Sequence, residues 1–149
     1  MRIIKSNKMS DIISINQRSI YAKSEICIIE LSTLNELIPS DEAEAMREKW
    51  KSRKIQVKQL SNMQNFESWT DVGGFIKTCM SIRQVDESVL PIKAEVLVFD
   101  DVVAFYRVKP EISILVIEDD DFANQQRALF TAIWEKAKPL SLNSDGSTK

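Results

Sequence analysis

The chain of 149 residues contains no histidine, only two cysteines and only three glycines. Histidine is the usual general base of nucleophilic catalysis, so a hydroxyl or thiol nucleophile would lack its common partner here. Zinc sites draw mainly on cysteine and histidine, which argues against one. The glycines form neither a Gly-x-Gly-x-x-Gly nor a Walker pattern, so nucleotide binding has no support. We therefore expect no cofactor and no metal, and we expect Cys27 and Cys79 to be buried, reduced thiols.

The sequence also lacks a long apolar run and an excess of one charge. No run approaches the roughly 18 apolar residues of a membrane-spanning helix. Basic and acidic residues number 20 and 22, for a net charge of -2, so no overall field attracts nucleic acid or an anionic membrane. The first eight residues have no apolar segment typical of a secretory signal. We expect a cytoplasmic protein without direct nucleic-acid or membrane binding.

What the sequence does contain is a succession of strand and helix patterns in a single domain. We expect a flexible N-terminus over residues 1–8, a domain over 9–140 and a disordered polar tail over 141–149. Strand-like runs cover residues 26–31, 55–60, 81–85, 95–99, 102–108 and 112–117. Helical patterns cover residues 9–23, 40–54, part of 68–78, and a terminal helix that reaches Pro139. The strand-helix-strand unit at 26–60 predicts a parallel pair. The fold class is therefore α/β, with a mixed, partly parallel sheet and helices on both faces.

Several of these segments together are similar to a known family. The segments that carry the similarity are 91–105 with its Asp100-Asp101 pair, 112–117, 118–140, 26–31 and 41–60. In their order they resemble the effector half of TrmB-like transcriptional regulators, over about residues 10–140. The resemblance implies half of a phospholipase D-like fold, and a partner that is a second copy or a related helix-turn-helix regulator. The winged helix that usually precedes this module has no counterpart before Ile26.

The same resemblance directs attention to one catalytic motif. Phospholipase D enzymes carry His-x-Lys-x-x-x-x-Asp on the strand that enters such a hairpin; the histidine is the nucleophile, and two copies, often one per subunit of a dimer, meet at the active site. That spacing here gives Lys93-x-Glu95-x-x-x-x-Asp100. A glutamate at the phosphate-binding position would repel a phosphodiester. The resemblance therefore implies a module without phospholipase or nuclease activity of that type.

Two clusters of charge have alternative interpretations. The run from Glu118 to Asp121 offers carboxylates to Ca²⁺ or Mg²⁺, but it also suits the N-terminus of the terminal helix, with Asp119 or Asp120 as cap. No glycine turn of an EF-hand follows it, and the cap is preferred. The basic residues from Arg47 to Lys54 surround Trp50, as in a nucleic-acid patch, yet nearby glutamates offset them. We interpret that helix as having a solvated charged surface.

Candidate ligand-binding residues follow the first two strands of the parallel unit. Ser32 follows the first strand, and Ser61 and Asn62 follow the second. The carboxyl ends of neighbouring parallel strands are a common ligand position, although polar loop residues explain the same pattern. Trp69 would line a pocket at this sheet edge or pack into the core.

The sequence leaves three hypotheses. The first is a non-catalytic regulatory module that acts by homodimerisation or by pairing with a full-length regulator. The second is a small-ligand sensor with a pocket near Ser32, Ser61 and Trp69. The third is a divergent enzyme that uses Lys93, Glu95 and Asp100 for acid–base or amine chemistry, against which a structural ladder of salt bridges is preferred.

Overall fold

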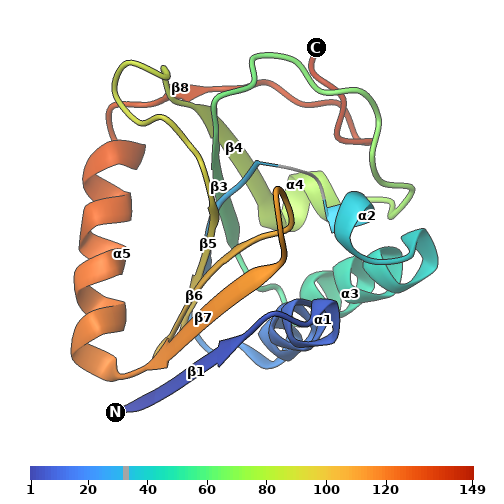
Figure 1. The fold of residues 1–149 in the computed structure, drawn as a ribbon. Coiled ribbons are helices and arrows are strands. Elements are labelled where there is room, and N and C mark those ends of the chain that lie inside the picture. Colours follow the sequence, from blue (N-terminus) through green and yellow to red (C-terminus); the bar gives the residue numbers. More distant parts are fainter. Residues whose placement is uncertain (32–33) are drawn as a thin grey trace.

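A computed structural model describes residues 1–31 and 34–149, and its strands form one continuous twisted sheet (Figure 1). Across the described residues the sheet has eight strands in the order β1-β7-β6-β5-β2-β3-β4-β8. The strands are β1 (Arg2–Ser6), β2 (Ile26–Ile29), β3 (Val57–Ser61), β4 (Met80–Gln84), β5 (Glu95–Phe99), β6 (Val102–Arg107), β7 (Ser113–Glu118) and β8 (Lys138–Pro139). Strands β2, β3 and β4 run parallel, and the other neighbouring pairs are antiparallel. The predicted mixed, partly parallel sheet is confirmed.

Helices cover both faces of the sheet, as predicted. They are α1 (Met9–Arg18) with a following 3-10 turn η1 (Ser19–Tyr21), α2 (Leu34–Leu37), α3 (Ser40–Ser52), α4 (Phe75–Cys79) and α5 (Asp120–Trp134). Figure 1 shows α5 on one face and α1 to α4 on the other. No helix in residues 1–31 and 34–149 has the length and apolar character to cross a membrane.

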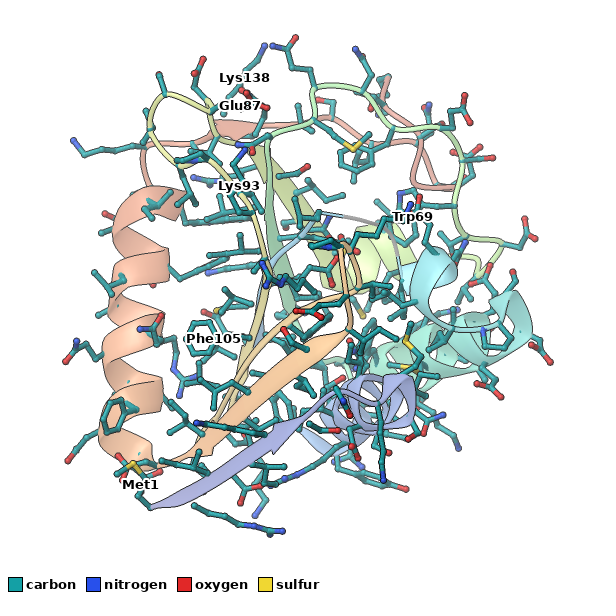
Figure 2. The ribbon with its side chains drawn as sticks, in the orientation of Figure 1. Met1, Trp69, Glu87, Lys93, Phe105 and Lys138 are labelled. Carbon is teal, nitrogen blue, oxygen red and sulfur yellow. The ribbon has the colours of Figure 1, made fainter. Side chains whose placement is uncertain are left out.

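Each layer encloses its own apolar core. The larger core lies between the sheet and α1 to α4, and the smaller one lies beneath α5. Strand β2 contributes to both, because Ile26 belongs to the larger core and Cys27 to the smaller. In Figure 2, Phe105 of β6 lies between the sheet and α5. Both cysteines are buried and unpaired, as predicted.

Both ends of the chain differ from the predictions. Residues 2–6, expected to be flexible, form β1 and pair with β7, with Ile4 opposite Val116. The polar segment 141–149, expected to be disordered, folds back on the domain, where the carbonyl of Asp145 accepts hydrogen bonds from the main-chain N–H groups of Trp69 and Thr70. The reason in both cases is pairing through the main chain, which the polar side chains do not reveal.

Two predicted helices also need correction. The pattern in 68–78 produces helix only after Gly74, whose left-handed backbone (φ 79°) begins α4 at Phe75. Helix α5 ends at Trp134 rather than at Pro139, because Lys138 and Pro139 pair with the edge of β4. The large apolar side chains of α5 are only partly covered: Phe130 and Trp134 are buried, whereas Phe122 and Leu129 are exposed.

Candidate functional site

A small cavity lies between the sheet and helices α1 to α4. Its volume is about 40 Å³, enough for roughly three water molecules. Strands β2, β3, β4 and β6 form one side, and residues of the four helices and of the loop before α4 form the other. Its wall is mostly apolar and aromatic. The polar side chains in the wall, apart from the tryptophans, are Asn16, Glu30, Arg47, Gln59 and Tyr106.

Arg47 of α3 is the most deeply buried charged residue in this wall, with 2% of its surface exposed. Its Nη1 donates to Glu44 Oε2 and to the carbonyl of Trp69, each at 3.1 Å. Its Nη2 donates to Asn35 Oδ1 at 2.9 Å. The guanidinium carbon also lies 4.8 Å from the centre of the Trp69 ring, within cation–π range. Arg47 therefore fastens α2 and the loop before α4 to α3.

Glu44 completes this clamp from the same helix. Its carboxylate accepts hydrogen bonds from the Thr70 hydroxyl and the Asp71 N–H, both at 2.7 Å. Burial alone would raise the pKa of Glu44, but these hydrogen bonds and Arg47 outweigh it, so the pKa lies below its ordinary value. The carboxylate therefore stays charged opposite Arg47.

Two further acids lie at the end of the cavity where β2 finishes and β5 begins. Glu95 is the first residue of β5 and is 3% exposed. Loss of solvent, and then the negative charge of Glu95, raise the pKa of Glu30 well above its ordinary value, although Arg47 opposes this. Burial and Glu95 likewise raise the pKa of Tyr106, whose hydroxyl exchanges hydrogen bonds with Asn16 at 3.2 and 3.3 Å. This end of the site disfavours additional negative charge.

The cavity wall also contains a hydrogen-bond donor without a partner. Trp50 is 5% exposed, and its indole Nε1 is buried with no hydrogen-bond acceptor among the described residues. Buried polar atoms are hydrogen-bonded in the great majority of cases, either to protein atoms or to ordered water. The cavity wall therefore contains one N–H donor that is not used in a hydrogen bond to the described residues.

The predicted ligand residues do not all converge here. Ser32 lies outside the described residues. The Ser61 hydroxyl accepts from the Met63 N–H at 3.0 Å. The Asn62 amide donates to the carbonyls of Val85 and Leu90 and accepts from the Ile92 N–H, so it holds the loop before β5. Trp69 does line the cavity, with its own Nε1 donating to the carbonyl of Gly146 at 2.8 Å.

Sequence reasoning missed the polar residues of the cavity. Arg47 was expected on a solvated helix surface, and its burial corrects that interpretation. The signal that was available is spacing, because Ala43, Met46, Arg47 and Trp50 stand at i, i+3, i+4 and i+7, the positions of one helix face. Glu30 and Tyr106 had no such signal, since only the pairing of β2, β5 and β6 brings them together.

The three residues at the phospholipase spacing do not form one site. Figure 2 shows Lys93 on the segment before β5, away from Trp69 and the cavity. Glu95 begins β5, and Asp100 follows its other end, roughly 15 Å away at the rise of an extended strand. The Asp100 carboxylate accepts from the N–H groups of Lys23 and Ser24, each at 2.9 Å. Asp100 therefore fastens the β5–β6 turn to the segment that precedes β2.

The acidic run before α5 caps the helix. Asp119 is the N-cap, and its Oδ1 accepts from the N–H groups of Asp121 at 3.0 Å and Phe122 at 3.2 Å. The preferred capping interpretation is confirmed. Within the part of the chain that the structure describes, no group of three or more acidic or cysteine side chains is arranged to hold a metal ion.

The fold is similar to those of several proteins with solved structures. No family model matches the chain, and no curated protein matches it in sequence. Among solved structures, NucT from Helicobacter pylori is 13% identical with a TM-score of 0.66, and the alignment covers 93% of this chain and 99% of that one. The phospholipase D family member Nuc from Salmonella typhimurium is 17% identical with a TM-score of 0.64, with 93% and 95% covered.

A third structure is TrmBL2, an archaeal chromatin protein that binds DNA. It is 15% identical with a TM-score of 0.63, and the alignment covers 93% of this chain but 55% of TrmBL2, so the chain spans just over half of that protein's length. At these identities the likeness shows a shared fold alone. The protein has the phospholipase D-like half-domain fold that is common to NucT, Nuc and TrmBL2.

Proposed function

We propose that this protein is a non-catalytic regulatory module, similar in role to the effector half of TrmB-like regulators. It acts by homodimerisation or by pairing with a full-length helix-turn-helix regulator. The observation that carries the proposal is Glu95, which stands where the phospholipase spacing requires a phosphate-binding lysine. A protein of the same fold in which the residues at this spacing neither match the catalytic motif nor lie together is suited to regulation by association.

The electrostatics around Glu95 support the absence of phosphodiester chemistry. A phosphate there would face Glu95 together with Glu30, whose pKa is raised first by burial and then by the negative charge of Glu95. Arg47, the nearby cation, is engaged by Glu44 and Asn35. Because like charges in a poorly solvated site repel strongly, this arrangement would destabilise a bound phosphodiester and its transition state.

The proposed absence of catalysis is tested with a chromogenic phosphodiester and with single- and double-stranded DNA as substrates. We expect the purified protein to hydrolyse none of them above the rate of a Lys93→Ala/Glu95→Gln variant prepared in parallel. Equal rates in both preparations would assign any trace activity to a contaminant. Turnover by the wild type that the double variant loses would overturn the proposal.

The association half is tested by native mass spectrometry of the protein purified gently from its own source. We expect the mass of two copies, or of one copy together with a helix-turn-helix regulator subunit. A protein recovered only as a monomer, with no such subunit, would contradict the proposal.

A second candidate function is a small-ligand sensor, and the unpartnered indole N–H of Trp50 in the cavity wall favours it. A small molecule with a hydrogen-bond acceptor would satisfy that donor, and aromatic side chains would enclose its apolar part. A ligand larger than a few water molecules requires part of the cavity wall to move, which is the kind of coupling a sensor uses.

Thermal unfolding in the presence of sugars, nucleotides and amino acids tests the sensor. A ligand at 100 times its Kd should stabilise the fold by about 2.7 kcal/mol. Trp50→Phe keeps an aromatic ring but removes the N–H, so it should abolish the shift. Trp134→Phe, at the end of α5 in the smaller core, should leave it unchanged. No stabilisation by any class, or a shift that Trp50→Phe retains, would count against this site.

A further inference from the structure

The outer face of α5 has an unusual composition for a solvent-facing helix. Between Phe122 and Ala132 the only charged residue is Arg127, whose Nη2 donates to the carbonyl of Asp100 at the β5–β6 turn. The exposed positions of this stretch are therefore uncharged in a chain of which 28% of the residues are charged. Helices that face only water usually carry charges on that side.

Large apolar side chains remain exposed on one flank of this helix. Phe122 is 48% exposed and Leu129 is 52% exposed. With Gln126 between them and Ile133 beyond, they stand at i, i+4, i+7 and i+11, which is one continuous stripe along a helix. The sheet covers a neighbouring stripe through Ala123, Phe130 and Trp134, and Ile133 is half-buried against the same core. The apolar surface of α5 is thus wider than the part of it that packs against the sheet.

The adjacent sheet edge extends this apolar surface near the start of α5. Ile3 of β1 is exposed and pairs with Ile117, which pairs in turn with Val103. Residues directly opposite one another across a sheet point to the same face. Because Val103 belongs to the core beneath α5, Ile3 lies on the α5 side. Figure 2 shows Met1 near the N-terminal end of α5.

The two ends of α5 carry opposite charge. Asp120 and Asp121 are exposed at its N-terminus. Lys136 and Lys138 are exposed just beyond its C-terminus and outweigh the single charge of Glu135. If two copies of α5 lie antiparallel, the acidic end of each meets the basic end of the other, and the uncharged flanks meet between them. This surface is therefore complementary to itself under a two-fold axis.

We propose that the flank of α5 formed by Phe122, Gln125, Gln126, Leu129 and Ile133 is the surface on which a second copy of this chain binds, with the two α5 helices antiparallel. The inference rests on the proposed homodimerisation and assigns it a surface. A helix pair with its flanking residues is smaller than the standard interface of about 800 Å² per partner. We therefore expect a reversible dimer with a dissociation constant in the micromolar range.

The first experiment measures mass by light scattering over a series of protein concentrations. The wild type should rise from 17.1 kDa toward twice that value. Leu129→Glu places two like charges at the contact and should weaken dimerisation about tenfold or more. The matched control is Val89→Glu, at a residue that is 69% exposed in the loop before β5, and it should dimerise like the wild type.

The second experiment identifies the surface directly by cross-linking. Leu129→Cys introduces a thiol close to the two-fold axis, which the pairing of Asp120 and Asp121 with Lys136 and Lys138 places near residue 129, while the native Cys27 and Cys79 are buried. Mild oxidation should produce disulfide-linked dimers of Leu129→Cys and few of Val89→Cys. Equal cross-linking of the two variants, or none in either, would overturn the assignment.

The outcomes separate this inference from the proposed function. A wild-type dimer that Leu129→Glu leaves intact would overturn the α5 surface while homodimerisation itself stands. A wild type that stays monomeric at every concentration would overturn the α5 dimer, and the regulatory proposal would then depend on the regulator subunit sought by native mass spectrometry. Circular dichroism of Leu129→Glu confirms that loss of the dimer is not loss of the fold.

Discussion

At the scale of single residues, the protonation of Glu30 makes the stability of the fold depend on pH. Its pKa is raised by burial and by the neighbouring Glu95, so the folded protein holds the proton more tightly than the unfolded chain does. The resulting contribution to the free energy of unfolding is fully present when the pH is below the ordinary glutamate pKa of about 4.5. It is lost as the pH rises through that value toward the folded-state pKa. The fold should therefore become less stable over this range.

Glu30→Gln removes this titration, and the variant should gain stability over the wild type as the pH rises. The gain is at most about 1.4 kcal/mol per pH unit across the affected window. Urea unfolding at mildly acidic and mildly alkaline pH measures it. Glu48→Gln, at an exposed position of α3, is the control and should follow the wild type. A Glu30→Gln gain that does not change with pH would contradict the assignment.

At the scale of single elements, α5 shows how local sequence sets the start of a helix but leaves its end to the tertiary structure. Asp119 caps the first turn, and Asp120 and Asp121 follow it, where the helix dipole favours negative charge. At the other end the chain leaves the helix at Trp134 and extends along β4 at Lys138 and Pro139. The cap is encoded locally, whereas the stop depends on a strand far away in the sequence.

Asp119→Ala should therefore cost about 1 kcal/mol of folding stability, because two main-chain N–H groups lose their acceptor. Asp119→Asn retains a side-chain oxygen and should keep most of that stability. The free energy of unfolding in urea, measured for both variants, tests the prediction. A loss of the same size in both would point to the charge, rather than the capping hydrogen bonds, as the source of stability.

At the scale of the whole molecule, the two ends of the chain complete the structure. The N-terminal strand extends the sheet beyond β7, and the C-terminal segment closes over the loop that holds Trp69. Gly146 lies so close to the Trp69 ring that a Cβ atom there would stand 2.3 Å from Cε2, and its φ of 84° disfavours other residues. The loop before α4 thus depends on a glycine at the far end of the chain.

Gly146→Ala should cost about 1 to 3 kcal/mol, because it adds backbone strain and displaces the Trp69 ring. Gly73→Ala is the matched control, since no atom lies within 4 Å of the Cβ that it would add. Its effect should stay within about 0.5 kcal/mol. Thermal unfolding compares the two, and hydrogen exchange of the Trp69 amide should speed up only in Gly146→Ala. Similar stability of the two variants would contradict this, because it would show that the Trp69 ring can shift away from residue 146 at little energetic cost.

Much of the fold was predictable because its signals are local. The apolar run at 26–31, the alternation at 55–60 and the Asp100-Asp101 turn follow from side-chain periodicity and turn chemistry, and β2, β3 and the β5–β6 hairpin formed at or near those positions. The strands β1 and β8 were not predicted. Each is an edge strand held by main-chain hydrogen bonds to a single neighbour, and such pairing leaves little periodicity in the sequence.

The candidate site was predictable only in part. Trp69 lines the cavity and also packs against the larger core, so both of its interpretations apply, whereas Asn62 is engaged in holding a loop. The polar cluster of Glu30, Arg47 and Tyr106 draws on three elements, and no spacing within the sequence connects them. The pKa of Glu30 depends on Glu95, which lies far along the chain and is brought near by the antiparallel pairing of β2 with β5.

The α/β class, the parallel strand pair, the cap of α5 and the lack of histidine chemistry follow from residue identity or short-range spacing, so they could be predicted. Which charges are buried and which apolar side chains stay exposed could not, because burial depends on what packs on a residue in the folded protein. The loop before α4 covers Arg47 on one helix, whereas about half of Leu129 stays exposed on another.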